Sequence, residues 1–337
     1  MFNVENPVVI VCCTDNNYTM ALATTVCSVI ANVSSQRQIV VYLIANQITQ
    51  ANKKKIIKSL NKPNVNIEWL VPDEEKFINA RISNHITVAA YYRILIPELL
   101  PAKYQKVIYL DSDVIFKTNI EKLWDTEVAD NYVLAVQDMD IDAAYVSSPN
   151  GIKKYQELGI AADCKYFNSG ILVINTEKWR RDNLSEKIIN YINNNRQHIR
   201  LHDQDAMNAV IAGKWGELDP RWNTQAAIHK YSSWKETALT EEAYNNVINN
   251  SYVVHFSSVA KPWKLGCKHP DRSLFFQYID LTAWSGYRLT FIRKVWIKIK
   301  DVIEEKSILL TKRKASNKNH KTTNSSQENK RIFVKGA

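Results

Sequence analysis

Two aspartates, Asp111 and Asp113, directly follow a short apolar segment and are the residues with the clearest potential for chemistry. Residues 107–110 are strand-forming and apolar, as is typical of a strand buried on both faces of a mostly parallel sheet. Alternate residues of an extended chain point the same way, so both carboxylates can converge just beyond the strand. Open α/β sheets bind ligands at that edge, and paired carboxylates there would suit a hard cation. The same spacing also occurs where two aspartates only begin a turn or cap the next segment.

Three nitrogen-bearing side chains could complete such a site. Arg93 is the only strongly charged group among the apolar residues 89–96, in a segment predicted to be helical over residues 87–100, so it needs a partner: either a structural Asp, or a ligand phosphate and the Asp pair itself. His255 lies near the end of a predicted strand at residues 252–256. A lone histidine there is often structural, but with two carboxylates it makes a ligand set suited to Mn²⁺. Lys261 follows closely and could neutralise a phosphate.

The N-terminal segment has the order in which α/β folds present a nucleotide pocket: a strand at residues 8–13, a polar loop, and a helix at residues 19–33. It has neither the GxGxxG nor the GxxxxGK[ST] pattern, so a Rossmann dinucleotide site and a P-loop are both unsupported. Asp15 and Asn17 in the loop could contact a base or a ribose, or could form an Asx turn that caps the helix.

The remaining predicted elements alternate between strand and helix. This order predicts an α/β fold with a mostly parallel central sheet flanked by helices. In the helix predicted at residues 206–212, Asp203 is also a candidate N-cap. The further strands are expected at residues 38–45, 65–71, 132–136 and 171–174, and the further helices at residues 49–60 and 176–195.

Charge and cysteine content restrict the function classes. The chain has 337 residues and a net charge of +10, but residues 288–337 hold 14 Lys and Arg against 4 Asp and Glu, which leaves 30 of each in residues 1–287. The neutral body argues against a nucleic-acid-binding protein. The five cysteines lack CxxC or zinc-like spacing and are expected to be reduced in a cytosolic protein. No signal peptide or membrane-spanning segment is expected.

Six segments, spread in order over roughly residues 7–265, resemble the family 8 glycosyltransferases, which include bacterial lipooligosaccharide galactosyltransferases and glucosyltransferases and are similar in their core to glycogenin. The resemblance implies a GT-A type, nucleotide-diphospho-sugar transferase fold. One departure is Ser258, where the family usually has glycine; its side chain could narrow the approach to the diphosphate or acceptor. The segments are CCTDNNY (12–18), AYYR (90–93), IYLDSDVIF (108–116), YFNSGILVIN (166–175), HDQDAMN (202–208) and HFSSVAKPW (255–263).

The resemblance also implies roles for residues. Asp111, Asp113 and His255 would hold Mn²⁺, with Mg²⁺ as an alternative. The donor, a UDP-hexose, would be bound by Cys13, Asp15, Asn17, Arg93, Asp111, Ser112, Asn168, Gly170 and Lys261. Gln204, Asp203, Arg93 and Asp138 would act at the transferred sugar.

The implied reaction transfers galactose or glucose to a glycan or lipid-linked saccharide with retention of configuration, in lipopolysaccharide or other cell-surface polysaccharide synthesis. A divalent ion and Lys261 would stabilise the charge on the leaving diphosphate. Gln204 is an amide and a poor nucleophile, so we favour same-face attack by the acceptor, with Asp203 as the fallback nucleophile. The alternative enzyme is a phosphatase of the haloacid dehalogenase type, but the chain lacks the later paired-Asp motif that this class needs.

The expected domains are a catalytic domain at residues 1–265, a basic and aromatic helical appendage at residues 266–311, and a disordered low-complexity tail at residues 312–337. Ile292, Val295, Trp296 and Ile299 recur at helical spacing with basic residues on the flanks. This pattern predicts an amphipathic helix that binds an anionic membrane surface, which would place the enzyme at the inner face of the membrane. A helix packed on the catalytic domain is the alternative.

Overall fold

The structure is a computed structural model that describes residues 3–82, 87–293, 295 and 299. The chain divides into two compact units, residues 1–287 and residues 288–337. The expected domain boundary after residue 265 lies inside the first unit, where α9 (Arg272–Ile279) packs on α1 (Thr19–Asn32). Most of the expected amphipathic helix, including Trp296, and the whole expected tail lie outside the described residues.

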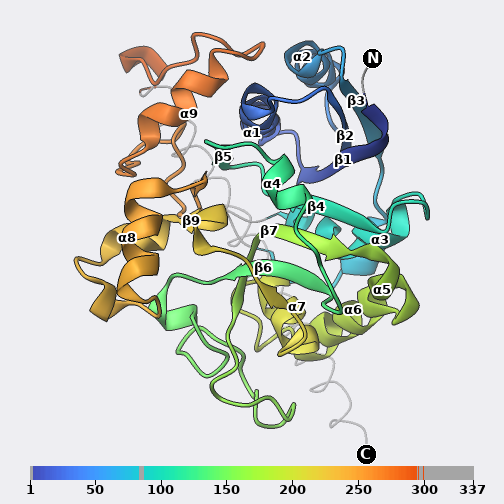
Figure 1. Cartoon of the computed structure of the whole chain (residues 1–337), viewed down its shortest axis with the longest axis vertical. Coiled ribbons are helices and arrows are strands. Elements are labelled where there is room, and N and C mark those ends of the chain that lie inside the picture. Colours follow the sequence, from blue (N-terminus) through green and yellow to red (C-terminus); the bar gives the residue numbers. More distant parts are fainter. Residues whose placement is uncertain (1–2, 83–86, 294, 296–298, 300–337) are drawn as a thin grey trace, which may run out of the picture. The chain divides into compact units, whose positions relative to one another are not determined.

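In the described part of the chain, the main sheet has seven strands in the order β3-β2-β1-β4-β7-β6-β8. β1 pairs in parallel with both β2 and β4, whereas β7 is antiparallel to both of its neighbours. The sheet is therefore mostly parallel, as expected (Figure 1). Its strands are β1 (Asn3–Thr14), β2 (Arg37–Ala45), β3 (Val65–Leu70), β4 (Lys106–Leu110), β6 (Val133–Gln137), β7 (Phe167–Asn175) and β8 (Gly216–Glu217).

A second, three-stranded sheet was not anticipated. It consists of β5 (Val114–Phe116), β10 (Val253–His255) and β9 (Thr224–Gln225), with β10 in the centre. β10 pairs antiparallel with β5, and His255 lies opposite Val114 in the register. Because β5 begins directly after Asp113, this pairing brings His255 to the Asp pair.

Two helical predictions differ from the structure. The segment expected as one helix at residues 87–100 is a 3₁₀ helix, η2 (Val88–Leu95), followed by α3 (Ile96–Leu99), with Pro97 in the first turn of α3. The helix expected at residues 176–195 is two helices, α5 (Thr176–Arg181) and α6 (Leu184–Asn195). Asn183 separates them in a left-handed conformation with φ of 49°, which a continuous helix cannot contain.

The other helices cover the sheet or connect its strands. α6 packs against α7, which carries Asp203 and Gln204 at its first two positions (Figure 1). None of the described helices is long and apolar enough to cross a bilayer. The remaining helices are α2 (Gln50–Leu60), η1 (Glu74–Phe77), α4 (Glu121–Trp124), η3 (Ile141–Ala143), α7 (Asp203–Ile211), η4 (Pro220–Asn223), η5 (Ala226–Lys230), η6 (Trp234–Glu236) and α8 (Glu241–Asn250).

Candidate active site

A cavity of about 440 Å³ opens where β1, β4, β6 and β7 meet the second sheet. Nearly all the site residues expected from the sequence line it, although they come from segments far apart in the chain. Those that line it are Cys13, Asp15, Arg93, Asp111, Ser112, Asp113, Asp138, Asn168, Gly170, Asp203, Gln204, His255 and Lys261.

Asn17 does not line this cavity. Asp15 accepts hydrogen bonds from the backbone nitrogens of Asn17 at 2.8 Å and Tyr18 at 3.1 Å, so the loop forms the Asx turn that the sequence left open. This turn leaves Asn17 exposed. The second oxygen of Asp15 accepts from Thr87 at 2.9 Å and stays at the cavity wall.

Asp111, Asp113 and His255 form a group that can hold a metal ion. Their candidate ligand atoms lie within 4.8 Å of one another. His255 Nε2 is 3.3 Å from Asp113 Oδ1 and 3.7 Å from Asp111 Oδ2. Two carboxylates and one imidazole are ligands that Mn²⁺ accepts.

Gly170 leaves room for this group. A Cβ atom at this position would lie 2.3 Å from Cε1 of His255 and 3.0 Å from Oδ2 of Asp111. The first distance is too short for any side chain unless His255 moves, and the second is a tight contact. The absence of a side chain at Gly170 therefore allows the histidine and the aspartate to approach each other.

The other nitrogen of His255 fixes the ring. His255 Nδ1 lies 2.8 Å from Asn223 Oδ1, and Asn223 Nδ2 donates to Asn168 Oδ1 at 3.0 Å. Because the Asn223 amide nitrogen is committed to Asn168, its oxygen accepts from Nδ1–H. Nε2 then keeps its lone pair toward the two aspartates, as metal binding requires.

Arg93 is buried and forms ion pairs with two carboxylates, those of Asp111 and Asp203. Its side chain donates to Asp111 Oδ1 at 2.8 Å, lies 3.1 Å from Asp203 Oδ2, and donates to the backbone oxygen of Ser169 at 2.6 Å. Burial lowers the pKa of the guanidinium, but the two aspartates outweigh this and raise it overall. Arg93 therefore pairs with one member of the Asp pair, Asp111, and with a second aspartate, Asp203.

Gln204 is held at both ends of its amide. Its Oε1 accepts from the backbone nitrogen of Ser169 at 3.0 Å, and its Nε2 donates to Asp138 Oδ2 at 3.0 Å. Asn168 donates to the same Asp138 oxygen at 3.2 Å. Burial raises the pKa of Asp138, and these hydrogen bonds oppose the rise. Gln204 is thus oriented by a buried network that continues through Asn168 and Asn223 to His255.

Lys261 lies beside Asp113, one of the three possible metal ligands. Its Nζ donates to Asp113 Oδ2 at 2.5 Å and to the backbone oxygen of Phe256 at 2.8 Å. Burial raises the pKa of Asp113, but Lys261 and His255 lower it to well below its ordinary value. Asp113 is therefore ionised at neutral pH.

Sequence reasoning missed Asn223, Ser169 and Tyr109. Tyr109 donates to Asp111 Oδ1 at 2.6 Å, and its ring lies under the Arg93 guanidinium, with 4.4 Å between the guanidinium carbon and the ring centroid. Tyr109 and Ser169 belong to segments quoted for the resemblance, so their position was a usable signal. Asn223 lies in a segment with no motif, and only the fold brings it to His255.

Residues 9–266 match the model of the family described as "Glycosyl transferase family 8", which is most of the chain. The chain belongs to glycosyltransferase family 8. This decides against the phosphatase and nucleic-acid-binding alternatives.

The chain is 38% identical over 279 residues to general stress protein A of Bacillus subtilis, covering 82% of this chain and 94% of that one. It is 24% identical to a lipopolysaccharide 1,2-glucosyltransferase of Escherichia coli, covering 80% and 77%. The solved structure of the galactosyltransferase LgtC with donor and acceptor sugar analogues is similar, with a TM-score of 0.71, 25% identity and coverage of 82% and 96%. This likeness identifies the fold as GT-A-like, as the sequence predicted.

Proposed function

We propose that this glycosyltransferase transfers glucose or galactose from a UDP-sugar to a saccharide or glycolipid acceptor, in lipopolysaccharide or other cell-surface polysaccharide synthesis. The observation that carries the proposal is the group of Asp111, Asp113 and His255 in the same cavity as the oriented amide of Gln204. The names of the glucosyltransferase and galactosyltransferase relatives support these two hexoses.

Asp111, Asp113 and His255 would hold the metal ion, Mn²⁺ or Mg²⁺. When bound, the ion supplies Lewis-acid stabilisation of the negative charge on the leaving diphosphate. The close approach of His255 and Asp111 that Gly170 allows, and the lone pair on His255 Nε2, fit such an ion. Lys261, whose ammonium lies beside Asp113, contributes a fixed positive charge to the same diphosphate.

The residues of the cavity favour a mechanism in which the acceptor attacks the sugar on the face from which the diphosphate leaves, so that the anomeric configuration is retained. A covalent route needs a carboxylate nucleophile, and the two candidates are poorly suited to it. Gln204 is an amide, and Asp203 Oδ2 is held by Arg93 at 3.1 Å and by Ser169 Oγ at 3.2 Å. Gln204 instead orients the sugar, while Arg93 keeps Asp111 and Asp203 in fixed positions.

The donor is tested by measuring sugar release from UDP-glucose, UDP-galactose and their N-acetyl forms, with Mn²⁺ and with EDTA. We expect release from one of the two unmodified hexose donors, and none in EDTA. The variant Asp113→Asn should lose this activity and keep its fold, because Asp113 lies at a strand end. Full activity of the wild type in excess EDTA, or of Asp113→Asn, would contradict the proposal.

The stereochemical part is tested with Gln204→Ala and an acceptor saccharide. We expect a lower turnover number and a product that keeps the donor's anomeric configuration, because Gln204 orients the sugar without bonding to it. Proton NMR of the product separates the two anomers. An inverted product, or a glycosylated Gln204 in the wild type by mass spectrometry, would exclude same-face attack.

A further inference from the structure

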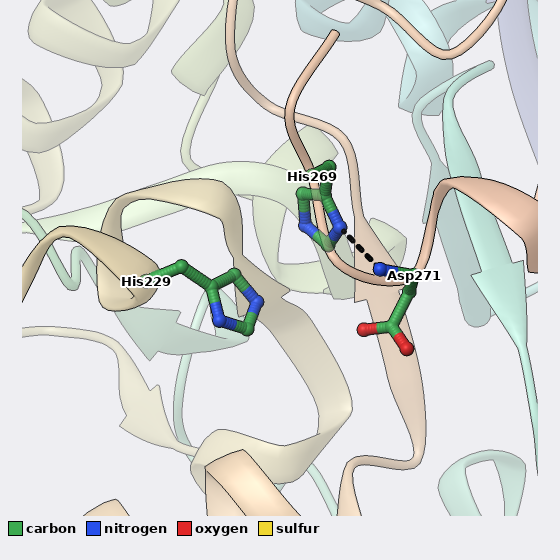
Figure 2. A group of neighbouring side chains, drawn as sticks. All are labelled: His229, His269 and Asp271. Carbon is green, nitrogen blue, oxygen red and sulfur yellow. Dashed lines mark hydrogen bonds between the residues drawn. The ribbon is translucent and has the colours of Figure 1, made fainter.

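A second group of possible metal ligands lies outside the cavity walls described above. It consists of His229 in η5 and of His269 and Asp271, which precede α9. Their candidate ligand atoms lie within 4.8 Å of one another, and the two ring centroids are 4.8 Å apart. Figure 2 shows the two rings and the carboxylate around one space.

These groups have few other partners in the described part of the chain. His269 Nδ1 accepts from the backbone nitrogen of Asp271 at 3.2 Å, but the buried Nε2 of His269 has no hydrogen-bond partner. Asp271 occupies the N-cap position of α9, yet its carboxylate makes no capping bond to the helix. A buried ring nitrogen without a partner is unfavourable unless a ligand satisfies it.

We propose that His229, His269 and Asp271 form a second metal site, selective for Zn²⁺ or a similar borderline cation, that ties η5 to the segment before α9. Two imidazoles and one carboxylate, with water in the fourth position, are a typical tetrahedral zinc set. The group of Asp111, Asp113 and His255 is richer in carboxylates. The two sites should therefore prefer different ions.

Binding requires only local movement. Tetrahedral Zn²⁺ with bonds of about 2.0–2.2 Å separates its ligand atoms by about 3.4 Å, so atoms that lie within 4.8 Å of one another must approach by at most about 1.4 Å. His229 is exposed and can rotate. For His269 to bind through Nε2, its proton moves to Nδ1, which costs the hydrogen bond from Asp271.

Metal binding requires neutral rings, and burial favours the neutral form of both histidines. Burial lowers the pKa of His269 to about 4, with a further contribution from His229 and opposition from Asp271. Burial also lowers the pKa of His229, and Asp271 opposes this shift.

The position of the group links it to the catalytic cavity. Ala226, Ala227 and Lys230 of η5 line that cavity, so a metal at His229 would hold one of its walls. On the other side, the ring of His269 packs on Phe256, with 4.7 Å between centroids, and Phe256 directly follows His255. The site would thus hold one wall of the cavity in place, without contacting the residues assigned to catalysis.

Cobalt(II) spectroscopy on the full-length protein tests the proposal without any substrate. After removal of metal with EDTA, we expect one equivalent of Co²⁺ to give the intense visible bands of tetrahedral coordination, which Zn²⁺ then abolishes. The bands should persist in Asp113→Asn and in the control His198→Gln. They should be absent in His229→Gln, an exposed position whose replacement leaves the fold intact.

Thermal unfolding gives a second readout. Zn²⁺ should raise the Tm of the wild type and of Asp113→Asn, with no such rise in His229→Gln or Asp271→Asn, whose Zn²⁺ affinity we expect to fall by at least roughly 10–100-fold. Asp271→Asn keeps the shape of the side chain at the start of α9. If His229→Gln retains the bands and the Tm shift, or if Asp113→Asn loses both, the second site does not exist as proposed.

Discussion

Gly170 and Asn223 carry no charge, yet they determine where His255 can lie. Gly170 allows the approach of His255 and Asp111, and Asn223 selects the tautomer of His255 by accepting from its Nδ1. Replacing either residue should alter metal binding before it alters the fold.

We expect Gly170→Ala to weaken Mn²⁺ binding by at least roughly 10–100-fold, because the added Cβ displaces His255 or Asp111. Calorimetric titration with Mn²⁺ measures the loss. Gly213→Ala is a matched control: Gly213 has φ of +68° and an open environment, so alanine there strains the backbone without touching a ligand. If both variants bind Mn²⁺ like the wild type, Gly170 is not a requirement of the site.

We expect Asn223→Ala to weaken Mn²⁺ binding by roughly 10–100-fold, since His255 loses the acceptor that fixes its tautomer. A positioning role predicts that saturating Mn²⁺ restores most of the turnover number. The apparent Kd for Mn²⁺ in the sugar-release assay measures the first effect. An unchanged Kd with a permanently reduced turnover number would instead indicate damage to the Asn168 and Gln204 network.

At the scale of elements, the longer buried strands were predictable, whereas the shortest strands and the break between two helices were not. Buried strands read as continuous apolar runs, so the ends of β2, β3, β4 and β6 were predicted to within one residue, whereas β1 and β7 begin several residues before their predicted starts. The break between α5 and α6 depends on one residue in a left-handed conformation, which apolar periodicity does not record. β9, η5 and α8 were missed because their short or mostly polar segments gain their structure from tertiary contacts.

The break at Asn183 allows a stability test. Asparagine tolerates a left-handed conformation better than alanine does, so Asn183→Ala should lower the free energy of unfolding by roughly 1 kcal/mol, and Asn183→Gly should not. Urea denaturation followed by circular dichroism compares the two variants. A more stable alanine variant would mean that the helices join and that the break is not required. The effect on the cavity should be small, because Asn183 does not line it.

The candidate site shows the same division between what the sequence discloses and what it does not. Residues inside a matched segment, such as Asp111 and Gln204, could be assigned because the family's order of motifs places them. Asn223, by contrast, reaches His255 across 32 residues of chain. The group of His229, His269 and Asp271 has no recognisable spacing, because its members meet only after β10 has returned the chain to the cavity.

At the scale of the whole molecule, the boundary between the two units makes a specific prediction. A protein truncated after Tyr287 should fold and keep sugar release from its donor, because residues 1–287 form a compact unit that contains every cavity residue. If the basic segment after residue 287 binds membranes as the sequence predicts, truncation should abolish sedimentation with anionic vesicles, as high salt does for the full chain. Undiminished sedimentation would remove the membrane prediction, and unfolding would remove the assignment of two independent units.

The three possible metal ligands, Asp111, Asp113 and His255, come together only when the chain has folded. Asp111 and Asp113 precede β7 in the chain, Gly170 lies in it, and His255 follows the two aspartates by about 140 residues, so no early fragment holds the complete set. Contacts between such distant segments form late, because the loop that joins them must be closed first. A ligand that recognises only the completed arrangement leaves the refolding rate unchanged and slows unfolding instead. Mn²⁺ would thus slow the unfolding of the finished enzyme and protect it from proteolysis, but it would not speed the folding of chains that are still incomplete.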